Sequence, residues 1–460
     1  AYGDDGYQAN NTGSKTNIGA VYLFNLVDGD EVVTDDPGSF DKITLEAVIG
    51  KNYPGDKDIS LSGTYGENAG NNNTGPSSMA AGGITNSDQA NDKGGQLYPV
   101  SLSEDANGNT RLAVGLVKDD GYDSNLSDNK KVNRGAVLLF TFDDAANKDF
   151  SGGELAAVIG DGYDNSYDGG ANPRSGRDLD LNLNSSFEFG KDVALDYDPT
   201  LGVHRLAVLA TGDDGSDGSG VGSGSDDKTG AVHLFTFTDD DFGGVAHVGS
   251  LGSGYSGSRG DVNFDFNGEL FSLDISGSQL ALGAHLGDGS GDAVSNSGEV
   301  YVYEYDHYGT NCASCFSTPV LVGMVGHNYT GNAVNGVAQD VHVVPESGET
   351  LGSSDQFGVG VALDNSRLVV GANMGDGQNN AMENGEVHIF PATHYEISDG
   401  VFATNPSSDI TIWPSTLIGI LSAGSNVTLQ ANEDIIVSEA ITADNDGDGG
   451  NLTLQAGHSI

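Results

Sequence analysis

Basic residues are scarce in this sequence. Only 18 of its 460 residues are Lys or Arg, against 67 Asp or Glu, and the formal net charge is −49. Because binding to nucleic-acid phosphates needs clustered Lys and Arg, we expect no nucleic-acid partner, and an anionic membrane surface is disfavoured for the same reason. The acidic residues fall mainly in loops, which leaves two interpretations open: binding of divalent cations, or a charged exterior suited to extracellular or salty conditions.

Cysteine and long apolar runs are also nearly absent. The two cysteines, Cys312 and Cys315, form one CxxC in a Ser- and Thr-rich loop. One such pair cannot supply the four ligands of a zinc site, and a redox CxxC normally opens a helix, so we expect a local disulfide or idle thiols. No apolar stretch approaches the roughly 18 residues of a membrane span. The chain begins at Ala1 without an initiator Met or a signal peptide, and we expect it to be part of a longer protein.

The chain repeats a unit of four short apolar segments. The clearest segment begins at a Gly and is rich in β-branched and aromatic residues, and its copies are GAVYLF (19–24), GAVLLF (135–140), GAVHLF (230–235), GEVYVY (298–303) and GEVHIF (385–390). The segment before it has copies RLAVGL (111–116), RLAVLA (205–210), QLALGA (279–284) and RLVVGA (367–372). Composition and length predict a strand for each copy.

Two further segments complete the unit. The first has copies PVSLS (99–103), FGKDVALD (189–196), LFSLD (270–274) and FGVGVALD (357–364), and the last has copies LEAVIG (45–50), LAAVIG (155–160), VGSLG (248–252), VGMVG (322–326) and STLIG (415–419). No helical periodicity lies between them. Tandem four-stranded antiparallel units predict an all-β fold, a β-propeller over residues 1–420 with four full blades and a leading half blade from residues 1–50. Long insertions at 53–94 and 160–187 should be surface loops.

The combination of FGxxVAL, RLAVGA, DDG and GAVYLF resembles the FG-GAP repeat, the blade unit of integrin-α-like β-propellers. The best matches are residues 189–235 and 357–390, and the resemblance extends over roughly residues 1–420. It implies an extracellular propeller of the kind found in adhesion, matrix and glycan-binding proteins. In calcium-binding FG-GAP blades a DxDxDGxxD loop joins the first and second strands, whereas here that connection is short, as in LDNSRL (363–368). The family's calcium site is therefore not carried over.

The last forty residues differ from the rest. NVTLQANEDI (426–435) and NLTLQAGHSI (451–460) repeat at a spacing of 25 residues. They resemble the rungs of filamentous-haemagglutinin-like exoproteins, which are right-handed parallel β-helices exported by bacteria. We expect residues 421–460 to begin a parallel β-helix of a large bacterial surface protein. The alternative sets 427–437 beside 361–370 as the inner strands of another blade.

Acidic loops that follow the second segment are the candidate metal sites. Calcium takes six to eight oxygen ligands, whereas Asp and Gly also suit an ordinary tight turn, so both a calcium loop and a structural turn remain open. The segment DNDGDGG (444–450) has the spacing of an EF-hand loop, but Gln455 stands in place of the last Glu and no helices flank it. The candidate calcium ligands are Asp4, Asp5, Asp119, Asp120, Asp213, Asp214, Asp217, Asp288, Asp376, Asp444, Asp446 and Asp448.

Other motifs favour binding over catalysis. Arg259-Gly260-Asp261 spells the integrin-recognition tripeptide, but three residues match by chance often in such a chain. His233 and His388 occupy the strand position of Tyr22 and Tyr301, and we expect them at the surface or in a groove rather than as ligands. Neither a nucleophile arrangement nor a phosphate-binding loop stands out, so we expect no enzyme.

These features predict an extracellular or cell-surface structural or adhesive protein. Its propeller loops would recognise cell-surface or matrix proteins or glycans, with calcium as a stabilising cofactor, and the half blade would allow self-association into a filament. An alternative is a carbohydrate-binding module that stacks sugars on the tyrosines following the last segment, and a third candidate is a propeller hydrolase. The four tyrosines are Tyr53, Tyr163, Tyr255 and Tyr329.

Overall fold

The structure, a computed structural model, contains strands and turns, and its described residues include no helix. Accordingly, the described part of the chain has no helix of the length and apolarity needed to cross a membrane. The residues described are 20–27, 42–50, 56–60, 97–119, 133–163, 176–199, 202–213, 215, 230–255, 262–263, 269–277, 279–305, 319–329, 341–342, 351–364, 367–375, 385–391, 427–431, 433–437 and 451–459.

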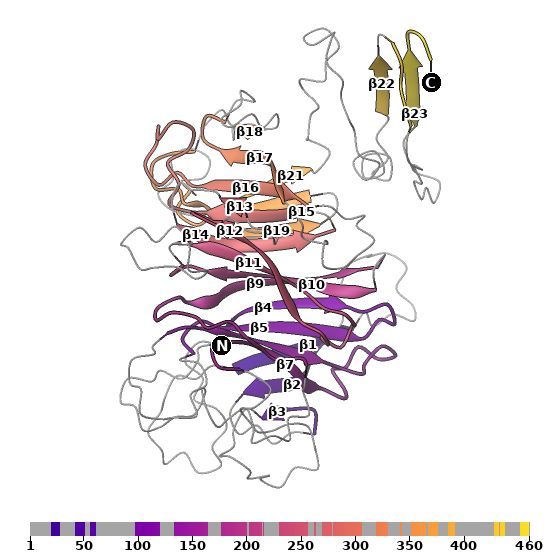
Figure 1. Cartoon of the computed structure of the whole chain (residues 1–460), viewed down its shortest axis with the longest axis vertical. Helices are drawn as coiled ribbons and strands as arrows, with labels where there is room; N and C mark the ends of the chain where they lie inside the picture. The colour runs from indigo at the N-terminus through magenta and orange to yellow at the C-terminus, as the bar shows by residue number, and fades with distance from the viewer. Residues whose placement is uncertain are drawn as a thin grey trace. The chain divides into compact units, whose positions relative to one another are not determined.

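Five of the six described sheets are antiparallel, apart from short parallel terminal strands, and follow one another along the chain (Figure 1). Sheet A contains β1 (Ala20–Val27), β2 (Lys42–Gly50) and β3 (Ile59–Ser60). Sheet B contains β4 (Leu97–Glu104), β5 (Thr110–Leu116), β6 (Ala136–Thr141), β7 (Glu154–Gly160) and β8 (Leu179–Asp180). Sheet C contains β9 (Phe189–Asp198), β10 (Val203–Ala210), β11 (Ala231–Thr236), β12 (Ala246–Gly252) and β13 (Val262–Asn263).

The two later sheets have the same order. Sheet D contains β14 (Leu270–Ser276), β15 (Gln279–Ala284), β16 (Glu299–Glu304), β17 (Val320–Gly326) and β18 (Val341–His342). Sheet E contains β19 (Phe357–Asp364), β20 (Arg367–Ala372) and β21 (Glu386–Pro391). The predicted fourth strand of sheet E, at 415–419, lies outside the described residues.

The sheets have the blade topology that the repeat predicts. In sheets B and C four strands form an antiparallel meander, and a short fifth strand pairs in parallel with the fourth. The prediction of an all-β chain with propeller-type antiparallel blades is therefore confirmed. The short parallel strands were not predicted, and two of them lie within the insertions expected to be loops: β3 within 53–94 and β8 within 160–187.

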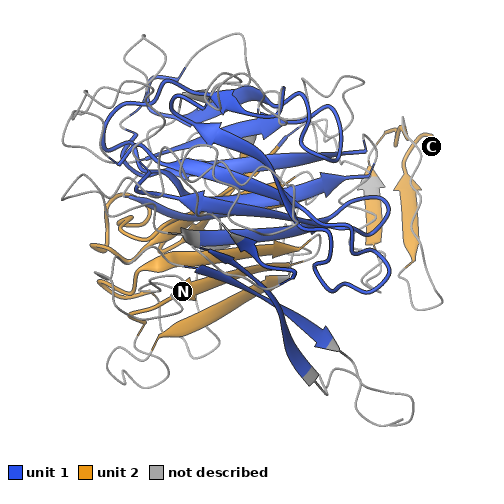
Figure 2. Ribbon diagram, turned by 90° about the horizontal axis from the view of Figure 1, so that it is seen from below, with its two compact units in different colours: residues 1–273, 305–319 blue, residues 274–304, 320–460 orange. Residues whose placement is uncertain are grey.

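The chain divides into two compact units (Figure 2). One comprises residues 1–273 and 305–319 and holds sheets A, B and C, and the other comprises 274–304 and 320–460 and holds sheet E and most of sheet D. In the first unit alternate residues of β6 face opposite ways: Leu138 and Phe140 pack with side chains of sheet A, whereas Val137 and Leu139 pack with side chains of sheet C. Sheet B is thus buried on both faces.

Glycine permits close contact between successive sheets. Gly298, which precedes β16, has a φ of 84°, and a Cβ placed on it would lie 1.9 Å from the carbonyl oxygen of Phe357 at the start of β19. Gly135 has a φ of 86° and the same relation to Phe189 at the start of β9. The Phe-Gly pair of one repeat and the Gly-led strand of the preceding repeat therefore form one contact, which explains why both motifs recur.

Polar side chains also connect the first strands of neighbouring sheets. The backbone N–H of Leu195 in β9 donates to Ser101 Oγ of β4 at 2.9 Å, and that of Leu273 in β14 donates to Asp192 Oδ2 of β9 at 2.8 Å. In the second unit the N–H of Leu363 donates to Asp274 Oδ2 at 2.7 Å. Each donor lies on the strand at the edge of its sheet, so the preceding sheet satisfies a backbone group that would otherwise be unpaired.

The last described strands form a separate pair. β22 (Val427–Ala431) and β23 (Leu452–Ala456) are parallel, with Val427 opposite Leu452 and Ala431 opposite Ala456. The two copies of the VTLQA-type segment are therefore paired in register. The alternative of an antiparallel inner pair of another blade does not agree with this pairing, and a two-stranded sheet does not by itself show a β-helix.

The contact at Gly298 predicts a selective effect of alanine. Gly298→Ala should lower the free energy of unfolding by about 2–4 kcal/mol, because it adds a strained φ and an overlap with the backbone of Phe357. Gly360→Ala is the matched control, since a Cβ at Gly360 meets nothing within 4 Å. Urea unfolding of both variants measures the difference. Equal midpoints would contradict the role given to this glycine.

Candidate functional site

The predicted acidic loops form the same turn after the second strand of each blade. The backbone N–H three residues beyond the strand bonds back to the carbonyl of the strand's last residue, with N to O distances of 3.1, 3.3, 3.1 and 3.2 Å at Asp119, Asp213, Gly287 and Gly375. These four positions are therefore equivalent, although two carry a carboxylate and two carry glycine. The predicted ligands Asp4, Asp5, Asp120, Asp214, Asp217, Asp376, Asp444, Asp446 and Asp448 lie outside the described residues.

The first carboxylate of the loop points into the blade in sheets B and C. Asp119 is fully buried, and the Tyr163 hydroxyl donates to it with both carboxylate oxygens at 3.1 Å. Asp213 is likewise fully buried and accepts from the Tyr255 hydroxyl at 2.5 Å and from the N–H of Gly215 at 2.9 Å. Both carboxylates therefore hold the blade together internally.

Sheet D keeps the carboxylate–tyrosine pair but takes its acid from another strand. Gly287 replaces the loop Asp, and Glu299 stands at the first position of β16, where sheets B and C have Ala136 and Ala231. Ala284 is opposite Glu299 in the sheet, which places this side chain next to the turn. The hydroxyl of Tyr329 donates to Glu299 Oε2 at 2.5 Å, and the hydroxyl of Tyr301 donates to Oε1.

Sheet E repeats this exchange. Gly375 replaces the loop Asp, Glu386 is the first residue of β21, and a Cβ on Gly375 would lie 2.9 Å from Glu386 Cγ. His388 Nε2 lies 3.1 Å from Glu386 Oε2. The signal was present in the sequence, because blades with Asp at the third position after the second strand have Gly-Ala at the start of the next strand, whereas blades with Gly at that position have Gly-Glu. Sequence reasoning did not connect the two positions.

The buried tyrosines correct one interpretation. Tyr163, Tyr255 and Tyr329 were candidates for stacking on sugars, but their exposed fractions are 2%, 2% and 3%. Their hydroxyls are directed to the carboxylates described above, and the rings are packed in the blades. Tyr53 lies outside the described residues. The described tyrosines of this set therefore offer no stacking surface.

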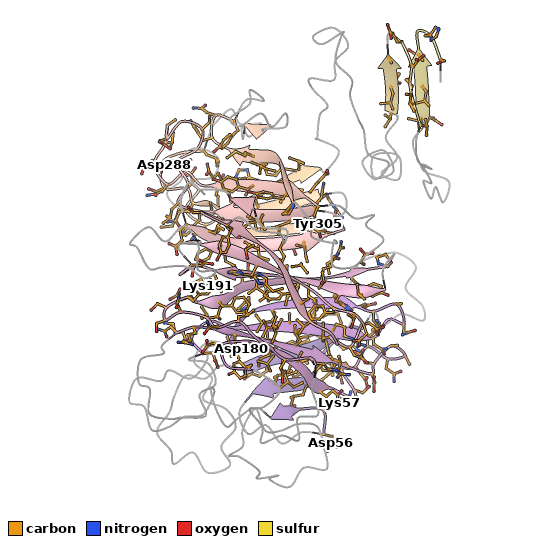
Figure 3. All side chains as sticks on the ribbon, viewed as in Figure 1. Asp56, Lys57, Asp180, Lys191, Asp288 and Tyr305 are labelled. Atoms are coloured by element: carbon orange, nitrogen blue, oxygen red, sulfur yellow. The ribbon has the colours of Figure 1, made fainter. Side chains whose placement is uncertain are left out.

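Asp288 is the third predicted ligand that the structure describes. It is labelled in Figure 3 and lies in the loop beyond β15, half-buried, where its Oδ1 accepts from the N–H of Asn296 at 2.7 Å. This bond closes the loop on itself, as a structural turn requires. Within the described ranges, no three His, Cys, Asp or Glu side chains are grouped so that they could hold a metal ion. Calcium binding stays a prediction that concerns the remaining loop residues.

Burial raises the pKa of Glu299 well above the ordinary value for a glutamate. Loss of hydration raises the pKa of Glu299 to about 7, against the opposing effect of hydrogen bonds from Tyr301 and Tyr329. The charges of Asp288 and Asp292 raise the pKa further. Near neutral pH this carboxyl group therefore exchanges between its acid and its anion inside the blade.

Sheet C contains a series of hydrogen-bonded side chains of the kinds found in hydrolase active sites. His233 Nε2 lies 3.0 Å from Asp213 Oδ2, His233 Nδ1 lies 3.2 Å from Ser250 Oγ, and that hydroxyl lies 3.0 Å from His247 Nε2. The order Asp, His, Ser is that of a hydrolase triad. However, Ser250 has an exposed fraction of 0% in the middle of β12, so its hydroxyl cannot reach a substrate. The expectation that His233 lies at the surface or in a groove is wrong, since this side chain is buried between its partners.

An arginine near the start of the second strand pairs with the hairpin that precedes it. Arg111 Nη2 lies 2.8 Å from Asp105 Oδ2, and Asp105 also accepts from the N–H groups of Asn107 and Asn109. Burial raises the pKa of Asp105, but the hydrogen bonds from Asn109 and the charge of Arg111 outweigh it and hold this pKa below its usual value. The guanidinium thus supplies the positive charge that balances the buried carboxylate of Asp105.

Sheet C has the same arrangement with a buried arginine. Arg205 is fully buried, its Nη2 lies 2.5 Å from Asp196 Oδ2, and its Nη1 lies 3.5 Å from Asp198 Oδ2. The guanidinium carbon is 5.2 Å from the centre of the Tyr305 ring, and Tyr305 is labelled in Figure 3. The Arg-Leu of the second segment therefore anchors the preceding strand connection in sheets B and C.

Comparison with known proteins agrees with the blade assignment. The family model of the FG-GAP repeat matches residues 349–390, the segment that contains β19, β20 and all of β21 but its last residue. No curated protein matches the chain. Among solved structures, the chain is similar to the computationally designed Ika8 protein, with 12% identity over 65% of this chain and 72% of that chain, at a TM-score of 0.20. That likeness is too distant to bear on fold or function.

The raised pKa of Glu299 predicts a pH dependence of stability. Because the pKa of about 7 in the folded protein exceeds the ordinary value of 4.5, folding favours the acid form, and this contribution is present below about pH 4.5 and lost as the pH rises to about 7. Glu299→Gln removes the ionisation, so its free energy of unfolding relative to the natural chain should increase by about 3 kcal/mol between pH 4 and pH 8.

Urea unfolding at several pH values measures this difference. Glu154→Gln is the control, since Glu154 is exposed on β7 and its replacement should leave the pH profile unchanged. Parallel profiles for Glu299→Gln and the natural chain would show that Glu299 keeps its usual ionisation in the folded protein.

Proposed function

We propose that this chain is an extracellular or cell-surface adhesion and recognition module, in which FG-GAP-type blades carry acidic loops to a partner. The observation that carries the proposal is the match of the FG-GAP repeat to residues 349–390, which coincide with the three described strands of a blade. Propellers of this kind are typical of proteins that bind at the cell exterior. The partner would be a cell-surface or matrix protein or a glycan.

The internal contacts of the blades support this proposal. Hydrogen-bonded carboxylates, tyrosines and arginines satisfy one another inside the sheets, as at Asp119 with Tyr163 and at Arg205 with Asp196. They are therefore not available to a ligand, and recognition falls to the connections between strands. The net charge of −49 favours partners with basic surfaces or partners bridged by cations.

The competing functions have less support. The sequence suggested a sugar-binding module because of its tyrosines, but Tyr163, Tyr255 and Tyr329 are buried in the structure. A glycan would therefore have to be held by polar groups of the loops. A hydrolase has only the Asp213–His233–Ser250 chain in its favour, and the serine is inaccessible. We therefore propose a binding protein rather than an enzyme.

The end of the chain extends the proposal. The parallel, in-register pair β22 and β23 and the repeat at 25 residues support a β-helix that begins at 421–460, as in bacterial surface exoproteins. In that arrangement the blades would form the recognition part of a longer structural protein.

Recognition is tested by direct binding. The fluorescently labelled chain should bind saturably to a panel of immobilised matrix proteins or to a glycan array, and binding should weaken as salt screens the acidic loops. The heat-unfolded chain is the control for charge alone. Absence of binding on both panels, or equal binding by the unfolded chain, would contradict a recognition function.

Calcium binding is tested by thermal unfolding. If the loop at 212–227 holds calcium, adding calcium after chelation should raise the Tm of the natural chain by several degrees, and a variant with Asp214→Asn and Asp217→Asn should lose that rise. Asp213→Asn is the control, because Asp213 bonds Tyr255 and its loss should lower the Tm equally with and without calcium. An unchanged Tm on chelation would mean that the loops are turns alone.

A further inference from the structure

One buried histidine of sheet C lacks hydrogen-bond partners. His204, the second residue of β10, has an exposed fraction of 0%. Neither of its ring nitrogens has a hydrogen-bond partner among the described residues. The centres of the Tyr197 and Phe242 rings lie 5.0 and 5.6 Å from the centre of the imidazole, so its ring contacts are aromatic. A buried polar group without a partner costs free energy, which makes this histidine an exception in a blade whose other polar groups are paired.

The repeat shows that this exception belongs to sheet C. The copies RLAVGL and RLAVLA align His204 with Thr110 of sheet B. Thr110 is also buried, but its backbone N–H donates to Asp144 Oδ1 at 2.7 Å and its hydroxyl donates to Asp144 Oδ2 at 2.8 Å. Sheet C therefore has an ionisable side chain without an acceptor where sheet B has a satisfied hydroxyl.

The imidazole faces the neighbouring sheet. Leu206 and Val208 are alternate residues of β10 and point to the same side of sheet C as His204. Both pack in one cluster with Ala113 and Val137 of sheet B. His204 therefore lies on the side of sheet C that is buried against sheet B.

A connection between two strands covers the histidine. We call residues 237–245, which join β11 to β12, the covering loop. It carries Phe242, whose φ of 65° is unusual for an aromatic residue. The Phe242 ring also contacts the Phe237 ring at 5.0 Å, and both side chains are buried in the cluster between sheets B and C. The covering loop therefore separates His204 from solvent through an aromatic side chain.

Polar contacts attach the covering loop to sheet B. Arg111 Nε donates to the carbonyl oxygen of Asp240 at 2.7 Å, and Arg111 Nη2 lies 3.0 Å from Asp241 Oδ1. The Gly244 N–H donates to the carbonyl oxygen of Gly176 at 3.0 Å. The Asp241 side chain is 53% exposed, so this ion pair is accessible to water and contributes little. The covering loop is the part of the site that can move at the smallest cost.

Charged groups surround His204 on each element packed against it. Burial and the positive charges of Arg111 and Arg205 lower its pKa from 6.5 to about 3, against the opposing effect of Asp105. The imidazole is therefore neutral in the closed site, and a proton on it would have no acceptor. The ionisable groups are Arg205 on the same strand, Tyr197 and Asp198 on β9, Asp105 and Arg111 on the hairpin of sheet B, and Asp239, Asp240 and Asp241 on the covering loop.

We propose that His204 is an acid-sensitive switch: when it takes up a proton, the covering loop leaves sheet B and the edge between sheets B and C opens. The charged imidazole is stable only where water can hydrate it, and movement of the covering loop is what admits water. Opening would also expose the Phe242 and Tyr197 rings. This response goes beyond the proposed recognition function, because it changes the fold of the blade edge with pH.

The direction of the effect follows from the lowered pKa. The closed form holds the imidazole neutral, whereas the open form binds a proton once the pH falls below about 6.5. The closed form is therefore fully favoured above pH 6.5, and its advantage is lost progressively as the pH falls from 6.5 towards 3. Between pH 7 and pH 4.5 the population of the open form should rise on the order of 50- to 100-fold.

Hydrogen exchange of the whole chain, followed by mass spectrometry, tests the switch at pH 7 and pH 4.5. Protection of residues 237–245, corrected for the pH dependence of the intrinsic exchange rate, should fall by that factor, while β6 should keep its protection. His204→Gln removes the ionisation and should abolish the fall. His458→Gln is the control, since the His458 side chain is 80% exposed and lies outside the site, and this variant should behave like the natural chain.

Three results of this experiment would overturn the proposal. They are an unchanged protection of the covering loop in the natural chain, an equal fall in His204→Gln, and an equal loss over β6, which would mean that the unit opens as a whole. Nitrogen NMR of the natural chain keeps the test independent of how well the variant folds. A neutral His204 imidazole at pH 5 is expected, and a protonated imidazole under a covering loop that stays protected would contradict the switch.

Discussion

The contact between the Gly-led strand of one blade and the Phe-Gly pair of the next controls the spacing of the sheets. At Gly135 and at Gly298 a backbone carbonyl of the next sheet takes the place of a side chain, and both glycines have positive φ. This approach brings Phe189 and Phe357 into the clusters between sheets, where they pack with side chains of both. Burial of both faces of a sheet depends on that distance, because a wider gap would leave the small side chains of the strands without contacts. The recurring motif is therefore a condition for packing.

The carboxylate–tyrosine pair is a second constraint, and it is satisfied in more than one way. Asp119 and Asp213 reach the tyrosine from a loop, whereas Glu299 reaches it from the adjacent strand with a longer side chain. A buried tyrosine hydroxyl needs a partner, and a buried carboxylate needs donors, so neither can be lost alone without a penalty. Sheets B and C have Asp in the loop and Ala at the start of the third strand, whereas sheet D has Gly in the loop and Glu at the start of that strand. In either case one carboxylate accepts the hydrogen bond of the tyrosine hydroxyl. It also explains why an acidic residue in such a loop is a poor guide to a metal site.

The repeat made the strands and their antiparallel order predictable, because segments such as RLAVGL and GAVLLF recur with fixed chemistry. The short fifth strands were not predictable, since two residues such as Leu179 and Asp180 carry no periodic signal. The sequence also did not predict whether a polar side chain points into the blade or toward solvent. Sequence alone places Asp213 in an acidic loop and Tyr255 after a strand, but whether they point outward to a ligand or inward to each other depends on the turn that joins them. His233 was misplaced for the same reason, because its partner Ser250 lies on the neighbouring strand.

The same polar groups that stabilise the blades also limit what they can do. Arg205 and Asp196 form an ion pair inside the blade, and the hydroxyl of Ser250 lies between two imidazoles where a hydrolase would need it exposed. A sheet whose polar side chains are paired and whose two faces are buried offers a partner only the connections between its strands. In this chain the connections are rich in acidic residues, and they are the part of the blades that we propose for recognition. A partner bound at the connections would therefore leave the paired polar groups inside the blade undisturbed.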